Sequence, residues 1–219
     1  MPILWLLVIV LAIAAVGFVF GRQRALAGVG GDARDLHSLP SYYGANAMMK
    51  SMVPAVGIMV IWLLAQPFFI DRTVAEMIPA SDIEEGSNRG LVMAEVSRTA
   101  EGIRNAVAAG AMTPEMAQDG RADFVDFTQR LRDAGQIVTN DLTANVVRAA
   151  QRFNELSAWG NAIMTAVVLV VALLGVLWGI YEAKPLFRAR NVVEQGSRAL
   201  LIAAASIAIQ TTVGIVFSL

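Results

Sequence analysis

Four long apolar stretches without Asp, Glu, Lys, Arg or His dominate the chain. They cover residues 2–20, 51–70, 159–181 and 199–219, and all 17 basic and 18 acidic residues lie in the three segments between them. A helix of about 20 apolar residues spans a bilayer core of about 30 Å, whereas an ionised side chain at the bilayer centre costs about 2.5–3.5 kcal/mol. The sequence therefore predicts an all-α, polytopic membrane protein with four transmembrane helices.

The composition excludes several classes of protein. The chain is 56% hydrophobic and 16% charged, whereas soluble domains average about 45–50% apolar and about 25% charged residues. It contains no cysteine and a single histidine, His37, which excludes disulfides, thiol catalysis and multi-histidine metal sites. The net charge of −1 does not suggest a nucleic-acid partner. We expect no enzymatic activity, no cofactor and no nucleic acid, with membrane lipid around the apolar helices.

The distribution of basic residues predicts the orientation in the membrane. Each of the short segments 21–50 and 182–198 contains four basic residues and two acidic ones, whereas the long segment 71–158 has nine Arg, no Lys and fourteen carboxylates. Short loops rich in Lys and Arg stay in the cytoplasm, and long loops are translocated largely regardless of charge. This pattern indicates a multi-pass protein of the bacterial inner membrane with a periplasmic N-terminus. No basic region precedes the first stretch, so we expect it to be retained as a helix and not cleaved as a signal peptide.

Three amphipathic helices are predicted within the periplasmic segment 71–158, forming a hairpin or bundle. The first begins at a capping box at residues 81–84 and ends at Gly110. The second opens at Pro114, and the third runs from about Val138 into the third membrane helix. An apolar stripe at helical spacing marks the first helix and consists of Val92, Val96, Ala100, Ile103 and Val107. We expect the first and third helices to pair as an antiparallel stalk.

Two possible reactive sites in the connecting segments have simpler explanations. Four aspartates could form a carboxylate cluster: Asp119, Asp123, Asp126 and Asp133. Arginines are interleaved with them, so a solvated helix face is the better interpretation. The sequence GVGGD at residues 28–32 could cradle a phosphate, but no strand precedes it and no Lys-Ser/Thr follows it.

The sequence LHSLPSYYG at residues 36–44 predicts an interfacial docking loop and not an active site. The residues assigned to it are Leu36, His37, Ser38, Leu39, Pro40, Tyr42, Tyr43 and Gly44. The residue before a proline avoids the helical region, so Pro40 favours an extended approach, and Gly44 permits a tight turn. Tyr42 and Tyr43 are expected at the level of the lipid headgroups. A lone histidine without a nucleophile or carboxylate partner is expected to pack or to form hydrogen bonds.

Small residues and prolines predict how the membrane helices pack and where they end. Small residues four apart let such helices approach closely, and two pairs have this spacing: Gly17 with Gly21, and Ala204 with Ala208. Pro54 is expected in the first turn of the second membrane helix, where its missing N–H is harmless. Pro67 is expected at a kink or at the end of that helix.

Several sequences in the chain resemble those of phosphate ABC transporter permeases. They are GRQRA at 21–25, LHSLPSYYGA at 36–45, PAV at 54–56 and RNVVEQGSRALLIAAASIAIQTTVGIVFSL at 190–219. Together they are similar to the extended N-terminal region of the C-type permease subunit of high-affinity phosphate import systems, in its long bacterial form. The resemblance implies a second permease subunit as a partner, ATPase subunits beneath the pair, and a periplasmic phosphate-binding protein that docks above.

The predicted spans divide the chain into three parts. Residues 1–70 form a two-helix membrane hairpin with a cytoplasmic loop at 21–50, and residues 71–158 form the periplasmic helical domain. Residues 159–219 form two membrane helices that, by the resemblance, lead into a permease core. The core would then lie beyond residue 219, so the chain is expected to be the N-terminal part of a permease, as a fragment or as the product of a split gene. Its expected role is assembly and structural support.

A transmembrane sensor with a periplasmic helical bundle is the alternative. The sequence EAKPLFRARNVVEQG at 182–196 is similar to the proline-bearing start of the relay helices of chemoreceptors. Such relays continue as amphipathic cytoplasmic helices, whereas residues 199–219 return to the membrane, which favours the permease. A stand-alone scaffold protein also stays open.

Overall fold

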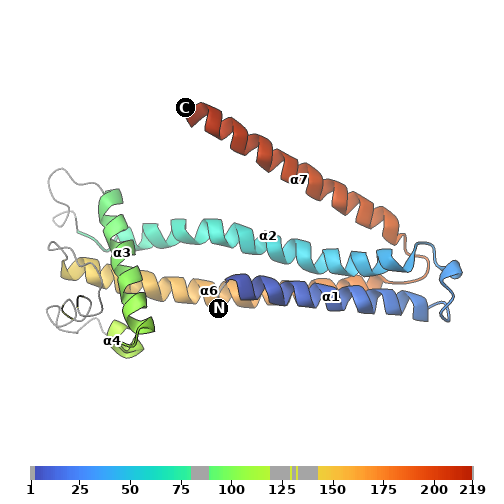
Figure 1. The fold of residues 1–219 in the computed structure, drawn as a ribbon, viewed down its shortest axis with the longest axis horizontal. Helices are drawn as coiled ribbons and strands as arrows, with labels where there is room; N and C mark the ends of the chain where they lie inside the picture. Colours follow the sequence, from blue (N-terminus) through green and yellow to red (C-terminus); the bar gives the residue numbers. More distant parts are fainter. Residues whose placement is uncertain (1–2, 80–88, 119–128, 130–131, 133–142, 219) are drawn as a thin grey trace. The chain divides into compact units, whose positions relative to one another are not determined.

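The computed structural model describes residues 3–79, 89–118, 129, 132 and 143–218. Its helices are α1 (Ile3–Ala27), the short 3₁₀ helix η1 (Ala33–Asp35), α2 (Pro40–Ala75), α3 (Arg89–Ala108), α4 (Pro114–Gln118), α6 (Ala144–Glu182) and α7 (Ala189–Ser218) (Figure 1). No strand occurs among the described residues. The predicted all-α fold is confirmed.

Four of these helices, α1, α2, α6 and α7, are long and apolar enough to cross a membrane. Each coincides with one of the uncharged stretches, which confirms the prediction of four membrane-spanning helices. α2 has 36 residues and α6 has 39. At about 1.5 Å per residue, both are much longer than a bilayer core of about 30 Å. They therefore continue as helices outside their apolar stretches.

The start of α2 differs from the prediction. The helix begins at Pro40 and not at Ser51, where the uncharged stretch begins. A proline at the first helical position loses no hydrogen bond, so Pro40 is suited to open the helix. Pro54 consequently lies in the helix interior, and α2 continues past Pro67 to Ala75. The absence of charge marks only the part of a helix that lipid can surround, so it does not report where the helix begins.

The chain divides into two compact units. Unit 1 comprises Met1–Val60 and Thr165–Leu219, and unit 2 comprises Ile61–Met164. Unit 1 therefore contains α1, the first part of α2, the last part of α6, and α7. The end of α2, α3, α4 and the start of α6 belong to unit 2. Both α2 and α6 contribute residues to each unit.

The core of unit 2 brings together residues that are far apart in the sequence. Its buried members are Ile70, Val74, Ile78, Val92, Val96, Ala100, Ile103, Ala106, Met112, Ala117, Val146, Val147, Ala149 and Ala150. The apolar stripe predicted for the first periplasmic helix forms the α3 part of this core, with Val107 packed at its edge. Gly110 follows α3 with a φ of 73°, a left-handed conformation that ends helices. Thr113 then caps α4, because its Oγ1 accepts a 3.3 Å hydrogen bond from the Met116 N–H.

The sequence predicts that the first periplasmic helix runs antiparallel to the third, but α3 does not run along α6. Figure 1 shows α3 lying across α6 and not alongside it. The core of unit 2 includes the end of α2 as well as the start of α6, and a crossing helix can contact both. α6 itself is one continuous helix, as predicted for a third helix that runs into the membrane. The capping box at 81–84, the four aspartates and Val138 lie outside the described residues.

Candidate functional site

Two glycines bring α1 and α2 into backbone contact. A Cβ added to Gly44 of α2 would lie 2.5 Å from the Phe18 carbonyl oxygen and 2.9 Å from Cδ2 of the Phe18 ring. A Cβ added to Gly21 of α1 would lie 2.9 Å from the Tyr43 carbonyl oxygen. The prediction that Gly44 forms a tight turn is therefore wrong. It lies inside a helix and is needed because α1 leaves no room for a side chain.

Two further glycines bring α6 against α2. A Cβ on Gly175 would overlap the Lys50 carbonyl group, and one on Gly179 would overlap the backbone of Ala47. Gly17 brings α1 against α6, because a Cβ added to Gly17 would lie 2.9 Å from a methyl group of Val176 on α6. Within unit 1, α1, α2 and α6 thus contact one another in pairs through glycine. We call this set of contacts the glycine seam.

Sequence reasoning found only part of the glycine seam. Gly17 and Gly21 were singled out by their spacing of four residues, and both lie in it. Gly175 and Gly179 have the same spacing in the third apolar stretch, which is the signal that could have identified them. Ala204 and Ala208 are exposed on α7 and do not join the seam.

Pro54 explains why the Lys50 carbonyl is available to α6. A proline has no N–H, so it cannot donate to the carbonyl four residues earlier in its helix. In α2 that carbonyl belongs to Lys50, and it is the group against which Gly175 packs. The next residue of α2, the buried Ser51, donates a 2.9 Å hydrogen bond from its Oγ to the carbonyl of Ala172, about one turn before Gly175 in α6. The interior proline therefore leaves free the carbonyl against which α6 packs through Gly175.

An ion pair joins α2 and α6 at the ends of their apolar stretches. The Lys50 ammonium group pairs with the Glu182 carboxylate and lies 4.2 Å from the centroid of the Trp178 ring. The two charged side chains are 18% and 26% exposed, so the pair is largely withdrawn from solvent. Asn46, one turn before Lys50, is 2% exposed, and its Nδ2 has no hydrogen-bond partner among the described residues. No group of three potential metal ligands occurs in the described part of the chain.

The predicted docking loop contacts the segment 183–190 of the same chain. The Pro185 carbonyl accepts two hydrogen bonds, from the His37 N–H at 3.1 Å and from the Tyr43 hydroxyl at 3.0 Å. The Tyr43 ring also lies 6.4 Å from that of Phe187, centroid to centroid. We call residues 36–44 together with 183–190 the latch.

The latch has an apolar core that shields Tyr43. Its buried members are Leu36, Tyr43, Ala183 and Ala189, which Ala25 of α1 joins, with Tyr42 partly buried beside them. Tyr43 is fully buried, so its ring does not face lipid headgroups as expected. Its position in a helix that begins at Pro40, and not in a loop, turns it towards the protein. Leu39, in contrast, is 67% exposed.

Ser38 caps a helix from a distant part of the chain. Its Oγ accepts a 3.3 Å hydrogen bond from the backbone N–H of Arg190, in the first turn of α7. The first N–H groups of a helix lack partners within it, and a serine hydroxyl is a preferred partner for them. A capping serine normally lies directly before the helix that it caps, whereas Ser38 lies 152 residues before Arg190. The latch therefore holds the start of α7.

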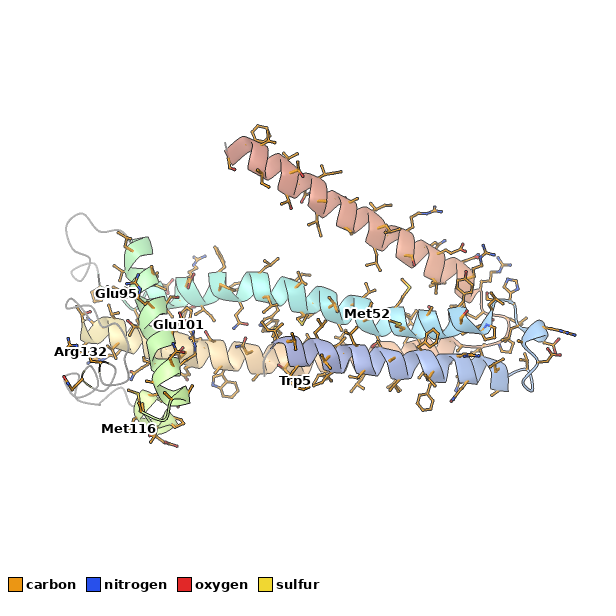
Figure 2. All side chains as sticks on the ribbon, viewed as in Figure 1. Trp5, Met52, Glu95, Glu101, Met116 and Arg132 are labelled. Carbon is orange, nitrogen blue, oxygen red and sulfur yellow. The ribbon has the colours of Figure 1, made fainter. Side chains whose placement is uncertain are left out.

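Beyond its first turns, α7 is largely uncovered. A Cβ added to Gly196 would lie 2.6 Å from the Met49 side chain of α2, whereas the most apolar window of α7 is 0% buried, and side chains project freely from its C-terminal half in Figure 2. Large apolar side chains are exposed along its length, including Ile202, Ile209 and Phe217. Ala204 and Ala208 belong to this uncovered surface.

A comparison with protein families gives one match. The sequence model of a family described as "Phosphate ATP-binding cassette transporter" matches residues 7–177, which is well over half of the chain. No curated protein and no solved structure matches. The matched range includes most of α1, all of η1, α2, α3 and α4, and most of α6.

Proposed function

Because the chain belongs to the phosphate ATP-binding cassette transporter family, we propose that it forms the N-terminal membrane portion of the permease subunit of a phosphate importer. Its role is to support assembly and not to catalyse a reaction. The resemblance of residues 21–45 and 190–219 to C-type permeases supports the permease assignment. Membership of a transporter family also favours this role over that of a transmembrane sensor.

The observation that carries the proposal is the contrast between α7 and the other membrane helices. The glycine seam packs α1, α2 and α6 together, with an ion pair and a buried hydrogen bond between α2 and α6. α7 is held near its start by the latch and by the contact of Gly196 with Met49, and its most apolar window is uncovered. This arrangement suits an anchored group of helices that presents a free helix to other transmembrane segments.

The partners proposed for this role follow the resemblance. A second permease subunit would lie in the membrane, ATPase subunits would bind at the cytoplasmic side, and a phosphate-binding protein would dock from the periplasm. Ala204 and Ala208 have the spacing that allows another helix to approach α7 closely. We place the contact with the rest of the permease on this face.

The test is co-purification of the assembled transporter with variants of α7. Ala204→Leu with Ala208→Leu adds bulk to the proposed contact face, and we expect less of the partner subunits to co-purify. Ser206→Leu with Gln210→Leu is the matched control, because these exposed residues lie about half a turn away and receive the same side chain. Equal recovery of partners with both double variants would contradict the proposal.

The orientation is a separate part of the proposal. We place the N-terminus in the periplasm of a bacterial inner membrane, the latch in the cytoplasm, and residues 71–158 in the periplasm. The chain has no native cysteine, so single cysteines report cleanly. In intact spheroplasts, a membrane-impermeant thiol reagent should label the exposed position Glu101→Cys and spare the exposed position Arg34→Cys. The opposite labelling would reverse the orientation and leave the assembly role untouched.

A further inference from the structure

Unit 2 contains two hollows that share part of their lining. The larger, of about 390 Å³, lies between α3, α4 and α6 and is lined by Arg104, Gln118 and Trp159 among others. The second, of about 350 Å³, is lined by Arg148 and Arg152 of α6 and shares Gln118, Gln151 and Glu155 with the first. Three arginines from two helices thus line adjoining cavities.

One of the three arginines is fixed by a chain of hydrogen bonds. The Arg104 Nη1 donates to the Asn154 Oδ1 at 2.6 Å, and the Asn154 Nδ2 donates to the Ala100 carbonyl at 2.9 Å. The amide of Asn154 is therefore held on both sides, and it orients the guanidinium group of Arg104 across the gap from α3 to α6. This contact occupies only one of the five N–H donors of that group.

The other two arginines lie one turn apart on α6. Arg152 Nη1 bonds the Glu155 carboxylate at 2.6 Å, with the two side chains 42% and 49% exposed. Arg148 is exposed and has no partner among the described residues. Among the described residues, the lining of the two hollows therefore has three cationic side chains and one carboxylate. This local excess of positive charge is unusual in a segment, 71–158, that has nine Arg and fourteen carboxylates.

We propose that the two hollows form a binding site for one phosphate group, held by Arg104, Arg148 and Arg152. Guanidinium groups present planar pairs of N–H donors that match the oxygens of a phosphate. The hollows are open to solvent and their arginines are partly exposed, so binding depends on ionic strength.

Two sources could supply the phosphate group. Trp159 lines the larger hollow, is 65% exposed and is the first residue of the third apolar stretch, which is where interfacial tryptophans gather. An anionic phospholipid could therefore place its headgroup on the arginines and its acyl chains along α6. Free phosphate would contact the arginines alone. Both sources present the same chemistry to the three guanidinium groups.

The experiment measures binding of defined probes to the full chain in detergent. Native mass spectrometry compares phosphatidylglycerol with phosphatidylcholine, and calorimetry measures inorganic phosphate. The test variant is Arg104→Gln with Arg148→Gln and Arg152→Gln. The control is Arg98→Gln, an exposed arginine of α3 outside both hollows. Each lost arginine removes charge-assisted hydrogen bonds to the phosphate group, so it should weaken binding by about tenfold at low ionic strength.

Each outcome decides the proposal. Preferential binding of phosphatidylglycerol that the triple variant loses and the control keeps supports the site with a lipid source. Binding of inorganic phosphate with the same pattern supports it with a free phosphate source. No binding of either probe, or equal binding by the wild type and the triple variant, overturns it. If the triple variant does not fold, Arg148→Gln alone decides, since Arg148 is exposed and its replacement removes no buried side chain.

Discussion

The contact between α1 and α2 at Gly44 allows a direct test of the glycine seam. Replacement of Gly44 by Ala adds a Cβ that would lie 2.5 Å from the Phe18 carbonyl oxygen. A carbon atom in a weak hydrogen bond to a carbonyl lies about 3.3–3.6 Å from the oxygen, so α1 and α2 would have to separate by about 0.8 Å. The obstacle is backbone, so no side-chain rotation can relieve it.

The magnitude follows from a comparison with a second glycine of the same helix. Gly57 also lies in α2, and a Cβ added there meets nothing within 4 Å. Both substitutions gain about 0.8–1 kcal/mol from the higher helix propensity of alanine. Only Gly44→Ala also incurs an overpacking cost, which is typically about 1–3 kcal/mol. We therefore expect Gly44→Ala to be less stable than Gly57→Ala by about 1–3 kcal/mol.

The assay is unfolding of the detergent-solubilised protein by sodium dodecyl sulfate, followed by circular dichroism. The test is the difference in free energy of unfolding between Gly44→Ala and Gly57→Ala, because the gain in helix propensity is nearly the same in both variants and cancels. If Gly44→Ala unfolds at the same or a higher denaturant concentration than Gly57→Ala, then α1 and α2 are not in backbone contact at this point.

Three more predictions can be checked by the same unfolding assay. Glu182→Gln should lower the free energy of unfolding by about 1–3 kcal/mol because it leaves Lys50 unpaired; the loss is smaller than the ~3–5 kcal/mol for a fully buried pair because this pair is partly exposed. The double variant Lys50→Met with Glu182→Leu should recover most of this loss. A double variant as unstable as Glu182→Gln would contradict the prediction. Asn46→Leu should raise the free energy of unfolding by about 1 kcal/mol because it removes a buried donor without a partner, and a loss of stability would show that the amide is satisfied. Tyr43→Phe should lower it by about 1 kcal/mol through loss of the hydrogen bond to Pro185, and no change would mean that this bond contributes nothing.

The membrane-spanning helices could be predicted because charge is strongly penalised in a bilayer. This penalty leaves four uncharged stretches in the sequence, and the structure has a long apolar helix at each. The same signal could not give the start of α2, because a helix continues unchanged into water. Pro40 opens this helix, and the charged Lys50 lies well inside it.

Close packing between the membrane helices could be predicted only where two small residues lie four apart in the sequence. The spacing of Gly17 and Gly21 indicated a close approach, and both lie in the glycine seam. Gly44 has no such partner four residues away, so its sequence context predicts a turn. Its role depends on Phe18 of another helix, which no local pattern reveals.

The latch depends on contacts between distant segments. Ser38 and Arg190 are 152 residues apart in the sequence, and the residues around each give no sign that the two form a hydrogen bond. The unusual composition of residues 36–44 predicts a docking loop, whereas the contacts of this segment with Pro185 and Phe187 arise only in the fold. Whether the loop also binds another protein stays a prediction.

The cap that Ser38 provides has a consequence for the order in which the protein is made. Chains leave the ribosome from the N-terminus at about 5–20 residues per second, so Ser38 emerges well before Arg190, to which it bonds. When the first turn of α7 forms, its hydrogen-bond acceptor is already present in the growing chain. The earlier part of the chain thus carries the acceptor that the first turn of α7 needs, and a nascent chain without Ser38 would leave the Arg190 N–H without this partner.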